Sequence, residues 1–187
     1  MRETEITVQI FNELAEIDGI LKAQGFEMIE TYRLKDWYFS KIEDAKRVEY
    51  ADLLKQSFLI RSVGDKAQLC YKNKEIDEGG IVISEEKTET EIGDLDKAIA
   101  VFQAAGLNNY CIVENESYVY QRGATSFVVQ VIKDLGTFLE YEEEESMRGL
   151  SAREKLSRLI ESANDLGLRL GKDYSCKKVY MLLKKNG

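Results

Sequence analysis

The first strand-like stretch of the chain, residues 3–10, alternates strictly between polar and apolar side chains. Ile6, Val8 and Ile10 occupy the apolar positions, and the polar positions are Glu3, Glu5, Thr7 and Gln9. Successive side chains of a β-strand point to opposite faces. The pattern therefore predicts a strand that presents two carboxylates, a hydroxyl and an amide on one face.

Similar alternation, or a high content of β-branched and aromatic residues, recurs along the chain. The further candidate strands are residues 28–40, two strands within 57–73, and residues 81–92, 109–115, 117–123, 125–132, 134–145 and 177–183. Gly64-Asp65 lies at the centre of 57–73 and predicts a tight hairpin turn there. We expect eight or nine of these ten candidates to form strands.

Three segments instead show the spacing of amphipathic helices. They are residues 12–26, 94–107 and 151–168. Gly25 is suited to end the first helix, and Asp94 is suited to cap the start of the second. Ser151 and Glu154 have the spacing of a capping box at the start of the third.

This order of elements predicts an α+β protein with one domain, residues 1–187, dominated by an antiparallel sheet. A sheet of eight or nine strands closes naturally into a β-barrel. Alternation alone also fits an open sheet with one solvated face. The three helices, however, need an apolar surface to cover. Helices packed outside a barrel would leave the charged side chains inside.

Composition and charge narrow the range of possible partners and cellular locations. The chain has 187 residues and a net charge of −8, which argues against nucleic acid or an anionic membrane as a partner held by bulk charge. No apolar run reaches the ~20 residues of a membrane span, and we expect a cytoplasmic protein.

The cysteines Cys70, Cys111 and Cys176 are dispersed, which is typical of reduced thiols. A homodimer is compatible with the sequence, which leaves the oligomeric state open.

Histidine is absent from the sequence. This excludes Ser-His-Asp and Cys-His nucleophilic mechanisms and most zinc sites. Any chemistry must come from carboxylates, lysine, arginine, tyrosine or a bound hard metal ion.

Several short motifs occur in an order that resembles the CYTH superfamily, the triphosphate tunnel proteins that include class IV adenylyl cyclases and thiamine triphosphatases. The matching segments are "ETEIT" (3–7), "KDWYF" (35–39), "FLIR" (58–61), "LCYK" (69–72), "KTETE" (87–91), "DLGTFLEYE" (134–142) and "KKVYMLL" (177–183). Each motif is short, but together they cover nearly the whole chain in the family's order. The resemblance implies a triphosphate-tunnel-like barrel with helices packed outside.

The resemblance also implies a set of binding residues. The implied metal ligands, direct or through water, are Glu3, Glu5, Glu140 and Glu142, and the implied substrate-binding bases are Arg61, Lys72, Lys87, Arg122 and Lys178. Hard cations such as Mg²⁺ or Mn²⁺ prefer carboxylate oxygens, and a triphosphate needs lysine and arginine donors. No catalytic residue is assigned.

The sequence departs from the family pattern at several basic or acidic positions. Thr7 replaces a lysine, Leu59 replaces an arginine, Gln130 replaces an aspartate, and residues 114–117 contain no base. We expect binding of a small, triphosphate-containing compound with a divalent metal, and activity as a metal-dependent phosphohydrolase. Two alternatives stay open: a class IV adenylyl cyclase activity, and a noncatalytic phosphate-binding protein that has lost its catalytic bases.

Overall fold

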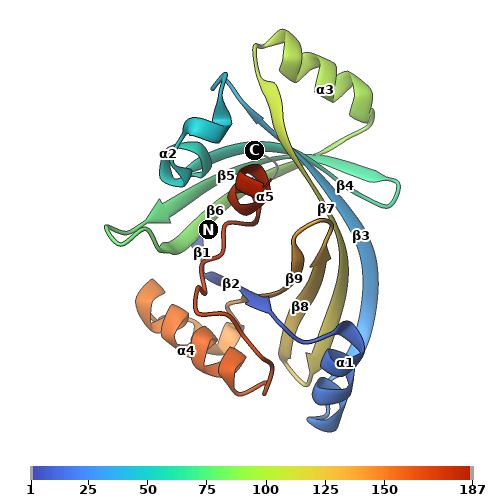
Figure 1. Cartoon of the computed structure of the whole chain (residues 1–187), viewed down its shortest axis with the longest axis vertical. Helices are drawn as coiled ribbons and strands as arrows, with labels where there is room; N and C mark the ends of the chain where they lie inside the picture. The colour runs from blue at the N-terminus through green and yellow to red at the C-terminus, as the bar shows by residue number, and fades with distance from the viewer. Residues whose placement is uncertain (1, 186–187) are drawn as a thin grey trace. The chain divides into compact units, whose positions relative to one another are not determined.

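The computed structural model describes residues 2–185 and is drawn in Figure 1. The described strands are β1 (Arg2–Glu3), β2 (Glu5–Ile10), β3 (Glu27–Ser40), β4 (Gln56–Val63), β5 (Lys66–Ile76), β6 (Val82–Ile92), β7 (Asn108–Arg122), β8 (Thr125–Ile132) and β9 (Gly136–Glu142). The described helices are α1 (Leu14–Ala23), α2 (Tyr50–Leu54), α3 (Leu95–Ala104), α4 (Ala152–Asn164) and α5 (Lys178–Lys185), with 3₁₀ turns at Ala45–Arg47 and Glu145–Met147.

The strands follow the order β1-β6-β5-β4-β3-β7-β8-β9-β2. The pairs β2–β9, β3–β4, β4–β5, β5–β6 and β8–β9 are antiparallel. Nine strands in an antiparallel sheet, with helices between them, confirm the α+β class expected from the sequence. The described part of the chain contains no helix with both the length and the apolar character needed to cross a membrane.

The chain divides into two compact units, and the long strands β3 and β7 contribute one part to each. The first unit contains, among the described residues, Arg2 and residues 33–115 and 177–185. The second unit contains residues 3–32 and 116–176. Each unit is described separately below.

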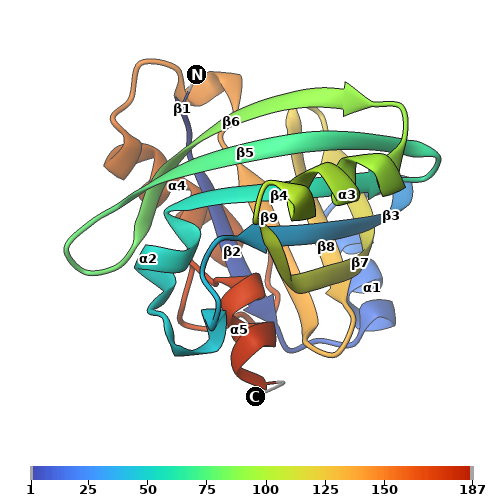
Figure 2. The same cartoon turned by 90° about the horizontal axis from the view of Figure 1, so that it is seen from above.

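In the first unit, β4, β5 and β6 run side by side as long antiparallel strands, as Figure 2 shows. Their β4–β5 hairpin turns at Gly64, whose φ of +58° suits a residue without a Cβ. Helices α2 and α3 pack against β4. The ring of Phe102 on α3 meets the ring of Phe39 edge-on, with centroids 5.0 Å apart.

The second unit has a buried apolar core built from strands β2, β8 and β9 and from helices α1 and α4. At its centre the ring of Phe127 lies 5.0 Å from Phe26, 6.1 Å from Tyr120 and 5.5 Å from Tyr141, measured between centroids. Helix α4 begins at the predicted capping box, in which Ser151 and Glu154 each bond the other's backbone amide. This core holds β2 and β9 as neighbours, which matters for the site described below.

Two expectations about secondary structure are wrong. Residues 177–183, expected as a closing strand, lie in a segment that becomes helix α5, where Val179, Leu182 and Leu183 are buried. Their spacing of three and four residues puts them on one helical face. The two strands expected at 109–115 and 117–123 form one strand, β7. The polar residues between them do not end it, because no glycine or proline interrupts the chain there.

Candidate metal centre and basic face

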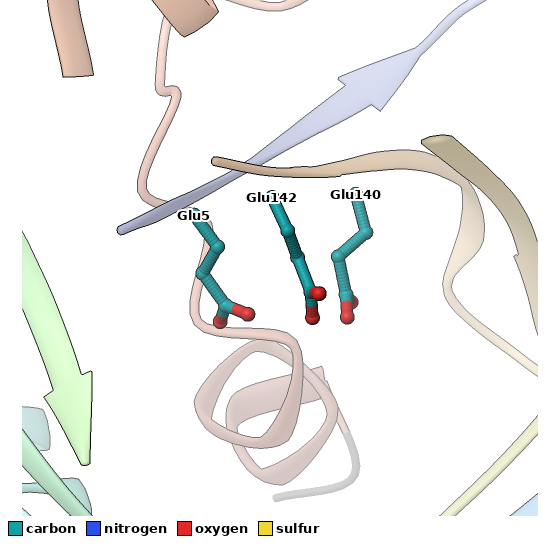
Figure 3. A group of neighbouring side chains, drawn as sticks. All are labelled: Glu5, Glu140 and Glu142. Atoms are coloured by element: carbon teal, nitrogen blue, oxygen red, sulfur yellow. The ribbon is translucent and has the colours of Figure 1, made fainter. Parts of the chain in front are cut away.

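Three acidic side chains converge in the second unit. Strand β2 pairs with β9 so that Glu5 lies opposite Glu142 and Thr7 lies opposite Glu140. Residues directly opposite each other, and residues two apart on one strand, share a face of the sheet. Glu5, Glu140 and Glu142 therefore point the same way, as Figure 3 shows, and each offers a carboxylate oxygen within 4.8 Å of the others.

This arrangement suits a hard divalent cation. Three carboxylates on two adjacent strands supply oxygen donors of the kind that Mg²⁺ and Mn²⁺ prefer. Glu5 and Glu140 are half-buried and Glu142 is exposed, so an ion could reach the oxygens from solvent. The cluster brings together three of the four predicted metal ligands. The fourth, Glu3, ends strand β1 and has an exposed side chain.

The first unit carries a polar face across β3 to β6. In the register of these strands, Asp36 lies opposite Arg61, Arg61 opposite Gln68, and Gln68 opposite Glu91. Two residues along β5, Cys70 lies opposite Glu89, and two further along, Lys72 lies opposite Lys87. The predicted bases Arg61, Lys72 and Lys87 thus share one face of the sheet.

Arg61 forms an ion pair on this face. Its Nε and Nη2 atoms each donate a hydrogen bond of 2.8 Å to one carboxylate oxygen of Asp36. The Asp36 side chain is only 5% exposed. Such two-pronged pairing is the strongest arrangement open to a guanidinium and a carboxylate, and it fixes the orientation of Arg61.

Lys72 and Lys74 are held by a third residue of the same face, Glu85 on β6. The Nζ atom of Lys72 donates to Oε1 of Glu85 at 2.9 Å, and Nζ of Lys74 donates to Oε2. Burial raises the pKa of Glu85, but the two ammonium groups outweigh it and lower the pKa to about 2. Glu85 is therefore ionised at neutral pH.

Burial also shapes the chemistry of two neighbours. It raises the pKa of the Cys70 thiol to about 11, and it raises the pKa of the Tyr38 hydroxyl well above its usual value. Both groups are therefore protonated at neutral pH. Cys70 is 1% exposed, which fits a role as a small packing residue better than a role as nucleophile.

The other predicted bases lie in different surroundings. Arg122, in the second unit, donates from Nη1 to the carbonyl oxygen of Gln24 at 2.9 Å and lies over the ring of Phe26, 4.4 Å from its centroid. It therefore supports the end of helix α1. Lys178 begins helix α5 in the first unit. Sequence reasoning assigned no role to Asp36, Lys74 or Glu85, although Lys74 and Glu85 share the parity of their predicted neighbours Lys72 and Lys87.

Three of the positions that depart from the family pattern are buried. Thr7 is 7% exposed, Gln130 is 5% exposed and Leu59 is fully buried. The backbone of Thr7 also makes two hydrogen bonds. Its amide donates to the carbonyl oxygen of Tyr174, and its carbonyl oxygen accepts from the amide of Cys176. These three uncharged side chains are therefore packed in the interior of the protein.

No protein-family model matches the sequence, and no curated protein matches it. Solved structures do share its fold. A protein from Pyrococcus horikoshii has a TM-score of 0.72 at 18% identity, covering 97% of this chain and 98% of its own. A conserved hypothetical protein from Pyrococcus furiosus has a TM-score of 0.72 at 23% identity, with coverage of 97% and 99%.

A proposed adenylate cyclase from Vibrio parahaemolyticus has a TM-score of 0.65 at 17% identity and covers 95% of this chain and 96% of its own. At such identities the likeness concerns the fold alone. It extends over nearly the full length of both chains, as the resemblance in motif order does. The structure therefore confirms the fold class predicted from the sequence, and the chain shares its fold with these solved structures.

Proposed function

We propose that this chain binds a divalent metal at Glu5, Glu140 and Glu142 and a small phosphate compound at the basic face of the first unit. We further propose that it acts as a metal-dependent phosphohydrolase on triphosphate-containing compounds. The observation that carries the proposal is the convergence of the three carboxylates on adjacent strands. Mg²⁺ and Mn²⁺ are the proposed metals.

The parts have distinct chemical tasks in this proposal. A metal ion held by the three carboxylates of the second unit would supply Lewis-acid chemistry and neutralise negative charge on a phosphoryl group bound to it. Lys72 and Lys74 would donate charge-assisted hydrogen bonds to phosphate oxygens, and Arg61, oriented by Asp36, would do the same. No side chain of the described residues is assigned as general base or nucleophile.

Mn²⁺ or Mg²⁺ should raise the melting temperature of the wild-type protein. A ligand that binds only the native state stabilises it by about 2.7 kcal/mol at 100 times its Kd, which corresponds to about 5–10 °C for a chain of this size. Glu140→Gln keeps the shape of the side chain but removes a central ligand charge. We expect it to abolish most of the rise, as measured by differential scanning fluorimetry across a metal titration.

Glu145→Gln is the matched control, because Glu145 has an 84% exposed side chain and pairs with nearby Arg148. It should keep the full metal response. An equal response in wild type and Glu140→Gln would show that the metal binds elsewhere.

The basic face can be tested through phosphate binding. Lys72→Gln removes one buried ammonium group and should weaken the binding of tripolyphosphate by about tenfold or more, the worth of one charge-assisted hydrogen bond. Isothermal titration calorimetry in the presence of Mg²⁺ measures the change. Lys97→Gln, on the exposed surface of α3, should leave the affinity unchanged. If Lys72→Gln binds as tightly as the parent, the phosphate site lies elsewhere.

A noncatalytic phosphate-binding protein is the second candidate. The observation that favours it is the burial of uncharged Thr7, Leu59 and Gln130 at positions where the resemblance leads one to expect charged groups. A turnover screen over nucleoside triphosphates, thiamine triphosphate and tripolyphosphate, with Mg²⁺ and Mn²⁺, separates the two. Release of phosphate supports the hydrolase, and binding without turnover supports the second candidate. Cyclic nucleotide formation would instead indicate the cyclase activity suggested for the Vibrio neighbour.

A further inference from the structure

The basic face of the first unit already contains its own anion. Glu85 is 2% exposed and accepts hydrogen bonds from two lysines of the neighbouring strand, one on each carboxylate oxygen. Lys72 and Lys74 are two residues apart on β5, so both side chains leave the same face. The result is a buried carboxylate held between two ammonium groups.

A phosphate group binds to proteins through the same kind of contact. Anionic oxygens accept charge-assisted hydrogen bonds from lysine donors on two sides. In this structure the Glu85 oxygens already accept those bonds from Lys72 and Lys74. A phosphate that binds to these lysines must therefore share them with Glu85 or draw them away from it.

The charge balance of the whole face points in the same direction. The acids that share the face are Asp36, Glu85, Glu89 and Glu91, and the bases are Arg61, Lys66, Lys72, Lys74 and Lys87. The acids thus cancel four of the five positive charges. A triphosphate carries about four negative charges, and a surface with so small a net charge offers it little net attraction.

We propose that Glu85 is a specificity-determining residue that limits how much phosphate charge the basic face accepts. The inference rests on the proposed phosphate site. With Glu85 in place, the Lys72 and Lys74 pair discriminates less strongly in favour of a triphosphate over phosphate groups of lower charge, such as a monophosphate or diphosphate. Removing the carboxylate shifts the preference toward the more highly charged ligand.

Glu85→Gln is the direct test, since it keeps the size of the side chain and removes its charge. Isothermal titration calorimetry with orthophosphate, pyrophosphate and tripolyphosphate, each with Mg²⁺, compares it with the wild type. Affinity for tripolyphosphate should rise about tenfold or more, and affinity for orthophosphate should rise less. Glu86→Gln is the matched control, because Glu86 is the next residue of β6, points to the opposite face and is exposed.

Glu85→Gln leaves two ammonium groups without their carboxylate and can lower stability. Glu85→Asp keeps the charge but shortens the side chain by one methylene, so that it reaches the two lysines less well. It should fold as the parent does and show a smaller rise in affinity for tripolyphosphate. Affinity for tripolyphosphate should therefore increase from the wild type to Glu85→Asp and from Glu85→Asp to Glu85→Gln.

The outcomes separate this inference from the proposed function. If the wild type binds phosphate compounds and neither Glu85 variant binds tripolyphosphate more tightly, the role of Glu85 is wrong and the proposed function stands. If neither wild type nor variants bind any phosphate compound, the proposed function fails and this inference fails with it. Equal gains for all three phosphates would show that Glu85 affects affinity without affecting selectivity, and would also overturn the inference.

Discussion

Asp36→Ala should lower the free energy of unfolding by about 3 kcal/mol, because it leaves the partly buried guanidinium of Arg61 without its carboxylate. Both hydrogen bonds of the pair measure 2.8 Å, and the exposed fractions are 22% for the Arg61 side chain and 5% for Asp36. Arg61 cannot lose its proton to escape the cost. Urea denaturation followed by circular dichroism measures the change.

Replacing both partners is the informative comparison. A double variant, Asp36→Leu with Arg61→Met, removes both charges, and we expect it to lose much less stability than Asp36→Ala alone. Asp44→Ala breaks the surface pair with Arg47, whose side chain is 86% exposed, and should cost less than about 1 kcal/mol. A loss as small for Asp36→Ala as for Asp44→Ala would contradict the structural role of the pair.

Phe127→Ala should destabilise the second unit by about 3–5 kcal/mol, the usual cost of deleting a buried phenyl ring. Phe127 is 2% exposed and its ring contacts those of Phe26, Tyr120 and Tyr141. The cost includes both lost burial and the cavity left among rings that cannot collapse fully. Thermal and urea unfolding of the full chain give the value.

Phe127→Leu fills most of that volume and should cost clearly less. Val101→Ala is a control for apolar truncation at the surface, since Val101 is 64% exposed, and should change stability by less than about 0.5 kcal/mol. Because this core holds β2 beside β9, Phe127→Ala should also weaken the metal response of the carboxylate cluster. A metal response unchanged in a destabilised Phe127→Ala protein would show that the core does not set the geometry of the cluster.

Local sequence determined most of the secondary structure. The alternation in residues 3–10 gave the strand face that carries Glu5, and Gly64 located the turn between β4 and β5. Ser151 and Glu154 marked the start of α4. These features depend on a few neighbouring residues, so side-chain parity, turn chemistry and capping are sufficient to predict them.

Other features depended on partners far away in the chain. Residues 177–183 have a strand-like composition. Residues Lys178–Lys185 nevertheless form helix α5, because a helix buries Val179, Leu182 and Leu183 on one face. Strand β7 runs through a polar stretch in which Glu114 pairs with Lys35 at 2.6 Å. Tertiary contacts of this kind override weak local preferences.

The candidate sites divide in the same way. Sequence parity alone showed that Glu5, Glu140 and Glu142 each lie on the polar face of a strand, but only the pairing of β2 with β9 brought them within reach of one ion. The contact of Glu85 with Lys72 and Lys74 depends on the register of β5 against β6. A longer loop connects these two strands, and a bulge at Glu75/Ile76 shifts their register. A two-residue turn fixes register, whereas a longer connection does not. The sequence by itself therefore determined which faces are charged, and the tertiary structure decided which charges meet.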